Sequence, residues 1–441
     1  MLWLTSAHIQ AQVPYDFRSV EQTTNELYQT GQWKELSTVA REALRQGIDY
    51  FYLRVRAGIA YYNLGKYVQA VTQLSAAQAF NDGDRTTLEY LYYSYLMLNK
   101  NSEAMSVLDQ SPPSLKDYLL KSGIARPHFV NLDLGVFMTD QDKHFRNEDL
   151  DGKDNVYGET DIFNQAWYVS AGGRWFPSRI FSGYLGYTNL RLDKNKLAMT
   201  GDSLILDKAY HVNQNQIYVN GTIYPGGGFN IVPAIHFINV RQVVPQRIFN
   251  SSENTYSFSE TTIILNNYIA YCSLNKDYKI IQAGIFGAIA NLNEQSQYQA
   301  GFDIVLFPEG NLDFYLKGQF IAHYNDGDLQ PVINSTLGAR LLKPVWVEVS
   351  GTFGKTENYF EKNASAVYNF PDYIRFKYEL HLIAIASKTL NISLDYQLLG
   401  KQAVILTYEQ AGNGGAVNYL PRRLLKNYSD HFLIASIKWK F

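Results

Sequence analysis

The chain has 441 residues, and its 39 lysine and arginine residues against 41 aspartate and glutamate residues give a formal net charge of −2. This balance excludes the bulk positive field that steers many proteins towards nucleic acid. Aromatic residues reach 15% and charged residues only 18%, which suits strands with one apolar and one polar face. The single cysteine, Cys272, excludes an intramolecular disulfide framework and a zinc site built from several cysteines.

The first twelve residues have the apolar start and small-residue end of a secretory signal peptide, with Ala11 before the expected cleavage point. They contain no lysine or arginine ahead of a short apolar stretch. We therefore interpret residues 1–12 as the end of a signal peptide whose beginning is missing. The alternative is a frayed N-terminal segment.

Residues 15–126 carry a helical repeat with a period of about 34 residues. Positions at this offset share small or aromatic character: Gly31 with Gly65, Trp33 with Tyr67, Ala43 with Ala77, and Ala70 with Ala104. The segment resembles a tetratricopeptide repeat (TPR) solenoid, in which antiparallel helix pairs stack on one another. The third copy has Asn99 and Asn101 in place of the turn glycine and the aromatic residue. Pro112 and Pro113 end the array, and residues 114–121 predict a short capping helix.

The resemblance implies a concave face on the second and third helix pairs that binds a partner protein. Aromatic side chains on such a face commonly anchor a bound peptide or protein. The alternative is that Tyr62 and Tyr93 pack against neighbouring helices. The expected partner-binding residues are Tyr52, Val55, Ile59, Tyr62, Asn63, Glu89 and Tyr93.

From about residue 128 the hydrophobic period changes to two, which predicts strands. In the last of them Leu433, Ala435 and Ile437 alternate with Ile434 and Ser436. An apolar face in strand after strand, opposite a charged face, is typical of a transmembrane barrel. No apolar run is long enough for a transmembrane helix, so a membrane-spanning structure here must be a closed β-barrel. We predict an antiparallel transmembrane barrel of about 14 strands over residues 127–441; the alternative is a soluble all-β sandwich or barrel.

The end of the chain resembles that of bacterial outer-membrane proteins, whose final aromatic residue belongs to the signal for barrel insertion. Trp439 and Phe441 are the expected insertion signal. The resemblance implies a bacterial outer-membrane location, with the TPR domain in the periplasm on the side of the short turns. In layout the chain is similar to exopolysaccharide-export outer-membrane proteins and to TPR-bearing outer-membrane proteins of the Bacteroidota.

The polar faces of the strands are expected to line the lumen and carry charges of mixed sign. Opposite charges on neighbouring strands can bridge one another and fill a narrow lumen, so the pattern predicts a plugged or narrow barrel. A slip of one residue in register would turn each of these side chains to the other face. The expected lumen network is Asp133, Asp303, Lys317, Arg340, Glu348, Arg375, Lys377, Glu379, Asp395 and Lys438.

Catalytic chemistry is not expected. Residues 201–204 match a short esterase signature but fall in a predicted hairpin loop, and Asp430 with His431 forms only a faint acid and base pair. The acidic loop at residues 147–154 resembles calcium loops, although an ordinary surface loop explains it as well. The histidines show no zinc spacing, and no phosphate-binding glycine loop follows a strand. No metal or cofactor is expected.

These observations favour a non-enzymatic outer-membrane barrel that anchors a periplasmic docking platform within an export or outer-membrane assembly complex. The expected partners are outer-membrane lipid and a periplasmic or outer-membrane protein bound by the TPR domain, with no nucleic acid. The alternative is an outer-membrane channel for a polysaccharide or a small solute.

Overall fold

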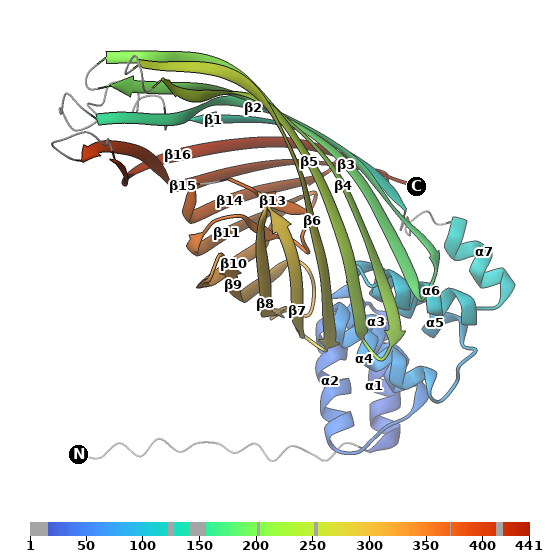
Figure 1. The fold of residues 1–441 in the computed structure, drawn as a ribbon. Coiled ribbons are helices and arrows are strands. Elements are labelled where there is room, and N and C mark those ends of the chain that lie inside the picture. The colour runs from blue at the N-terminus through green and yellow to red at the C-terminus, as the bar shows by residue number, and fades with distance from the viewer. Residues whose placement is uncertain are drawn as a thin grey trace, which may run out of the picture. The chain divides into compact units, whose positions relative to one another are not determined.

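The computed structural model describes residues 16–121, 128–141, 156–200, 203–250, 255–370, 372–411 and 418–441. The expected signal segment, residues 1–12, lies outside this part of the chain. The chain divides into two compact units. The first comprises residues 1–125 and 309–311, and the second comprises residues 126–308 and 312–441. Figure 1 shows that helices form the first unit and that long strands form the second.

The helical unit contains seven helices among the described residues. They are α1 (Phe17–Gln29), α2 (Trp33–Arg45), α3 (Phe51–Asn63), α4 (Tyr67–Gln78), α5 (Arg85–Met97), α6 (Asn101–Gln110) and α7 (Pro113–Lys121). The first helices of the three pairs begin at Phe17, Phe51 and Arg85, so the interval between helix starts is the predicted 34 residues. Helix α7 follows the third pair, where the sequence predicts a capping helix.

The turn inside each helix pair adopts the same backbone geometry. Gly31, Gly65 and Asn99 occupy equivalent positions with φ angles of 67°, 71° and 57°. Glycine adopts this left-handed backbone region without a steric penalty, and asparagine tolerates it better than most other residues. The third copy therefore keeps the turn despite losing its glycine.

Small residues let the helices of a pair approach closely. A Cβ atom added to Gly58 in α3 would lie 2.5 Å from Cγ of Leu74 in α4. Between α1 and α3, the Arg56 guanidinium contacts the Glu21 carboxylate at 2.9 Å. That hydrogen bond holds the pKa of Glu21 below its ordinary value, despite the partial burial of the carboxyl.

The second unit is a closed antiparallel barrel of 14 strands among the described residues. Its strands are β1 (Phe129–Thr139), β2 (Val156–Ser178), β3 (Phe181–Thr200), β4 (Ser203–Gly226), β5 (Phe229–Asn250), β6 (Thr255–Tyr278), β7 (Ile281–Leu292), β8 (Gln295–Leu306), β9 (Phe314–Asn325), β10 (Asp328–Leu342), β11 (Val345–Thr356), β14 (Tyr373–Ile385), β15 (Leu390–Ala411) and β16 (Asn418–Lys440). Strand β1 closes the barrel against β16, with Phe129 opposite Lys440. The predicted fold class and strand number are confirmed.

The outer face of the barrel is apolar. On β16, Leu433, Ile437 and Trp439 are exposed, while on the neighbouring β15 the exposed residues include Ile392 and Leu394. Large exposed apolar side chains of this kind occur on strand after strand, whereas soluble proteins rarely expose large contiguous apolar patches. No helix within the described ranges is long and apolar enough to cross a membrane. The barrel fold is consistent with an outer-membrane location.

The far half of β15 leaves its neighbour β14 and reaches across to β2. The pairing of β14 with β15 ends where Tyr373 faces Gln402. Further along β15, residues Leu406–Glu409 pair with Val156–Glu159 of β2. One end of the barrel is therefore narrowed by backbone pairing between strands that are not adjacent in the barrel order.

Candidate functional site

The connection between β11 and β14 folds back into the barrel as a hairpin. Its strands are β12 (Tyr359–Glu361) and β13 (Ala366–Tyr368); we call residues 357–370 the plug. Tyr359, Phe360 and Tyr368 are only 2%, 1% and 6% exposed. Burial of such aromatic side chains is worth about 1.5–3 kcal/mol each, which explains why this connection lies in the lumen.

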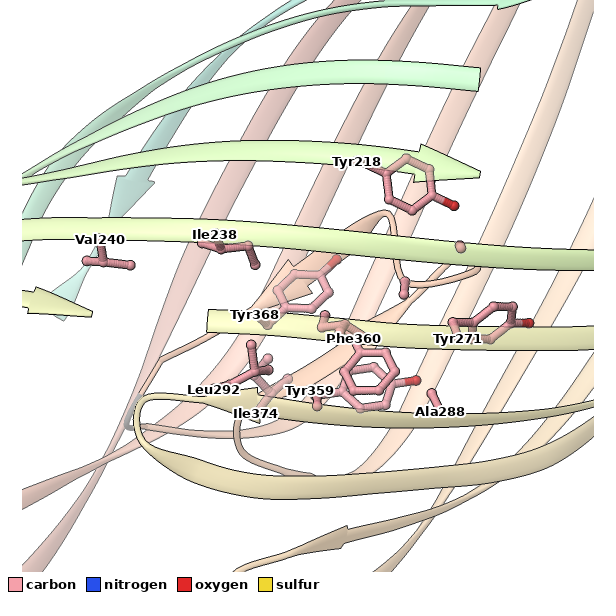
Figure 2. Packing of buried hydrophobic residues seen from close by; sticks show 14 of the residues in the cluster. Tyr218, Ile238, Val240, Tyr271, Ala288, Leu292, Tyr359, Phe360, Tyr368 and Ile374 are labelled. Atoms are coloured by element: carbon pink, nitrogen blue, oxygen red, sulfur yellow. The ribbon is translucent and has the colours of Figure 1, made fainter. Parts of the chain in front are cut away.

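The plug packs against the inner wall of the barrel. Figure 2 shows Tyr359, Phe360 and Tyr368 among wall residues from several strands. The wall residues of this cluster include Tyr218 of β4, Ile238 of β5, Tyr271 of β6, Ala288 and Leu292 of β7, and Ile374 of β14. The lumen is therefore filled at this level by the protein's own chain.

The tip of the plug is strained and is held by wall side chains. Lys362, Asn363 and Ala364 have φ angles of 53°, 57° and 63°, a region in which residues other than glycine cost free energy. Tyr218 donates to the carbonyl of Asn363 at 2.9 Å, and Nδ1 of His236 donates to the carbonyl of Ala364 at 2.7 Å. These bonds stabilise a backbone conformation that the free loop would seldom adopt.

Side-chain amides of the wall fix the stem of the plug. Asn358 donates to Oε1 of Gln295 at 2.8 Å and accepts from Asn293 at 2.8 Å. Nε2 of His323 donates to the carbonyl of Glu357 at 2.9 Å. Such bonds contribute about 1 kcal/mol each to stability.

A buried charge cluster joins the plug to β14. Lys377 contacts Glu361 of the plug and lies 3.1 Å from Glu379 on its own strand. Its Nζ also donates to the hydroxyl of Tyr368 at 3.2 Å. The side chains of Lys377, Glu361 and Glu379 are 4%, 5% and 7% exposed. Lys362 at the tip pairs with Glu379 from the other side, at 2.5 Å, so two ammonium groups face two carboxylates.

The predicted lumen residues on β14 and β15 divide between the two faces. Lys377 and Glu379 belong to the charge cluster, and Asp395 is buried with its Oδ2 3.1 Å from Nδ1 of His381. Arg375 does not face the lumen, and its placement corrects the prediction. A β-bulge between Ile374 and Phe376 breaks the alternation, so Arg375 is exposed and contacts Asn427.

The remaining predicted lumen residues form separate small groups. Arg340 pairs with Asp313 at 3.1 Å, and Glu348 accepts a hydrogen bond from Tyr315. Asp303 and Lys317 interact electrostatically across β8 and β9, as do Asp133 and Lys438 across β1 and β16. The structure brings these charges together in local pairs rather than in one continuous network.

Two adjoining cavities lie beside the plug. We call the larger one, of about 560 Å³, the vestibule. We call the smaller one, of about 50 Å³, the inner pocket. Both are lined in part by Phe370 of the plug. The vestibule walls combine apolar and polar side chains. The apolar ones include Leu190, Leu192, Val212, Val240, Val244, Ile263 and Leu265, and the polar ones include Glu159, Asp161, Lys194, Lys196, Arg247, Gln214 and Gln242.

The predicted partner-binding face is only partly available. Val55 and Ile59 are buried in a core with Ala77, so the prediction that they contact a partner is wrong. They point between the helices because α3 packs on both of its neighbours.

The other predicted positions on this face retain accessible surface. Tyr62 is half-buried against the rings of Tyr67 and Tyr90. The remaining residues are exposed or half-buried: Tyr52, Asn63, Glu89 and Tyr93.

Asp430 and His431 lie on opposite faces of β16. Asp430 is buried beside Lys401 at 3.1 Å, whereas His431 is hydrogen-bonded on the outer side to the hydroxyl of Tyr396 at 2.8 Å. Alternation along a strand separates neighbours in this way. The two side chains therefore do not form an acid and base pair.

The sequence analysis predicted a plugged or narrow barrel but did not identify the segment that forms the plug. Its charged and aromatic residues, Glu361, Lys362 and Tyr368, were not among the expected site residues. The signal was present in the four aromatic residues, Tyr359, Phe360, Tyr368 and Phe370, within residues 359–370, because a solvated loop carries fewer aromatic residues.

The fold and the site define a 14-stranded barrel of the outer-membrane type, with helices on its N-terminal side and a hairpin of its own chain in the lumen. No protein-family model and no curated protein matches the chain.

Several solved structures are similar at low identity. A FadL homologue of Pseudomonas aeruginosa is 8% identical with a TM-score of 0.46, over 71% of this chain and 90% of that one. The toluene transporter TodX of Pseudomonas putida is 6% identical with a TM-score of 0.42, over 72% and 92%. The translocator domain of the autotransporter NalP of Neisseria meningitidis is 7% identical with a TM-score of 0.34, over 74% and 93%. At these scores the similarity identifies neither a family nor a substrate.

Proposed function

We propose that the barrel is a gated, non-enzymatic channel for small, largely apolar solutes, and that the plug is its gate. The vestibule carries this proposal. Open aqueous pores have mainly polar lumens, whereas about half of the residues that line this cavity of about 560 Å³ are apolar, among them inward-facing Leu190, Val212, Val240 and Ile263, and the cavity reaches the plug. An apolar cavity with a few polar groups is the usual form of a small-molecule site.

The contacts of the plug support a reversible closure. Its tip conformation is strained, and hydrogen bonds and ion pairs hold its stem in addition to the packing of its aromatic side chains. Water can replace each of these polar contacts when the plug moves, so release costs less than the loss of an equally large apolar interface. A small solute also fits the vestibule better than a polysaccharide does, because a sugar polymer needs a continuous polar path.

Uptake of the apolar dye N-phenyl-1-naphthylamine by intact cells tests this proposal. We expect cells that carry the full chain in the outer membrane to take up the dye faster than cells without it. Val240→Asp, which places a charge in the vestibule, should slow uptake. Val219→Ala, on the exposed outer face of the neighbouring β4, is the control and should not. Equal uptake with and without the protein would exclude the channel.

We also propose that the helical unit is a TPR-type docking platform for a periplasmic or outer-membrane protein. The 34-residue spacing of its three helix pairs and the exposed ring of Tyr52 support this second role. A Tyr52→Ala, Tyr93→Ala variant should insert normally and lose co-purifying proteins while dye uptake is unchanged. Retention of the same co-purifying proteins would contradict a platform at these residues.

A further inference from the structure

The inner pocket combines aromatic rings with carboxylates. Three carboxylates contribute to its lining: those of Asp161 on β2, Asp372 beside the plug, and Asp430 on β16. The aromatic residues of the lining are Phe137, Phe163, Phe370, Tyr428 and Phe432. Ring faces and carboxylates both attract positive charge.

The pocket already stabilises one ammonium group. Nζ of Lys401 lies 4.0 Å from the ring centre of Phe370 and 5.1 Å from that of Tyr428. The same atom lies 3.1 Å from Asp430 and 4.0 Å from Asp372. Its side chain is only 5% exposed. The surroundings of Lys401 thus show that this wall stabilises an ammonium group that is shielded from water.

Two carboxylate oxygens in the same lining have no donor. Asp430 is 2% exposed, and its Oδ1 is buried without a hydrogen-bond partner among the residues described. Oδ1 of Asp161 is also buried without a partner, although the Asp161 side chain as a whole is 39% exposed, its Oδ2 lies 3.7 Å from Lys196, and Tyr210 interacts with the carboxyl group. Buried acceptors are normally satisfied, and leaving a charged one unpaired is costly. Both carboxylates are paired through Oδ2, Asp430 with Lys401 and Asp161 with Lys196, so their Oδ1 atoms leave acceptor capacity for one further donor.

The vestibule continues from the inner pocket. The two cavities share Asp161, Leu190, Leu192, Lys194 and Phe370 in their linings. A group that enters the inner pocket therefore leaves the rest of its molecule against the apolar walls of the vestibule. The small volume of the inner pocket, about 50 Å³, admits a compact head group.

We propose that the inner pocket and vestibule form a binding site for an organic cation with an ammonium head and an apolar body. The ammonium group donates to Oδ1 of Asp430 and Oδ1 of Asp161 and lies among the aromatic rings. Lys194 and Lys401 also line the inner pocket, so its three carboxylates exceed its two lysines by one, which favours singly charged ligands. Only the further step, that the bound cation is also carried through the barrel, rests on the proposed channel function.

Calorimetric titration of the full chain in detergent micelles with phenethylammonium chloride tests the site. The neutral 2-phenylethanol and the anionic 3-phenylpropionate are the matched comparison ligands. We expect the ammonium compound to bind about tenfold or more tightly than the alcohol, since a charge-assisted bond is worth more than a neutral one. Equal binding of all three compounds, or tightest binding of the carboxylate, would overturn the proposal.

Variants locate the binding to these oxygens. Asp161→Asn should weaken phenethylammonium binding about tenfold, and Asp430→Asn should do the same. Asp303→Asn, a lumen carboxylate on β8 outside the pocket, is the control and should bind normally. If a heat-modifiability gel shows that Asp430→Asn does not fold, the binding measured for Asp161→Asn alone tests the assigned site. Unchanged affinity in the folded Asp161→Asn variant would refute the assigned site.

The binding and transport proposals fail separately. Phenethylammonium binding without any dye uptake would remove the channel and leave the binding site. Dye uptake without preferential ammonium binding would leave the channel and remove the site.

Discussion

Replacing Lys377 with methionine should release the plug. The change removes the only ammonium group that contacts both Glu361 and Glu379 in the charge cluster as described. Lys362 still pairs with Glu379, so Glu361 is left as a buried charge without a cationic partner in that cluster. Removing one partner of a buried ion pair costs about 3–5 kcal/mol, because the other charge stays desolvated.

The unpaired carboxylate of Glu361 destabilises only the state in which the plug is docked in the lumen. When the plug leaves the lumen, Glu361 regains water and the penalty disappears. A penalty of about 3–5 kcal/mol raises the ratio of released to docked plug by roughly a hundred to several thousand fold, at about 1.4 kcal/mol for each factor of ten. Single-channel recording in planar bilayers measures this change directly as the fraction of time spent open.

Two variants control for other causes. The double variant Lys377→Met, Glu361→Gln also removes the unpaired charge of Glu361. It should return the fraction of time spent open towards the wild-type value. Lys438→Met removes a lumen lysine that pairs with none of the plug carboxylates described here. This variant should leave the fraction of time spent open unchanged. An inserted Lys377→Met barrel as silent as the wild type would refute the reasoning that this cluster holds the plug.

Three further predictions concern stability and insertion. Gly58→Leu should destabilise the helical unit, expressed alone, by about 1–3 kcal/mol through overpacking, and Leu74→Ala should recover part of this; an unchanged thermal melt would contradict the packing at Gly58. Because the Arg56 hydrogen bond lowers the pKa of Glu21, its stabilisation is present above the unfolded carboxyl value of about 4.3 and is lost as pH falls through the lower folded value. Melting temperature should therefore drop less on acidification in Glu21→Gln than in the wild type, and parallel curves would exclude this contribution. On the lipid face, Ile235→Arg, well inside β5, should cost about 2–4 kcal/mol, and Leu341→Arg, beside the turn after β10, about 0–1 kcal/mol; equal outer-membrane levels of the two would contradict the membrane placement.

The strands and the helix pairs could be predicted because each follows a short-range rule. Alternation places Leu433, Ile437 and Trp439 on the outer face of β16, and a period of two needs only neighbouring residues to be read. The 34-residue repeat likewise fixes the helix starts and turns, even where Asn99 replaces the glycine. Both patterns can be recognised in the sequence without knowing which distant segments come together in the fold.

The errors occur where structure depends on distant parts of the chain. Arg375 changes face because a bulge shifts the register by one residue, and alternation does not reveal where a bulge falls. Val55 and Ile59 are buried because α3 has packed neighbours on both sides, so a face that is concave in one pair is covered by the next. The plug depends on wall residues such as Tyr218 and His236, which lie more than a hundred residues earlier.

The plug offers an explanation for the buried lumen charges of mixed sign. A permanent seal would gain nothing from a buried lysine, because replacing a buried ion pair with apolar residues of similar volume is often neutral or stabilising. The plug instead combines an apolar hairpin with Lys377, Glu361 and Glu379, and its tip keeps a strained backbone at Ala364. Each feature lowers the cost of leaving the lumen: the charges regain water, and the tip relaxes. These features support the proposed gate, because a gate requires a limited free energy of opening and a plain anchor does not.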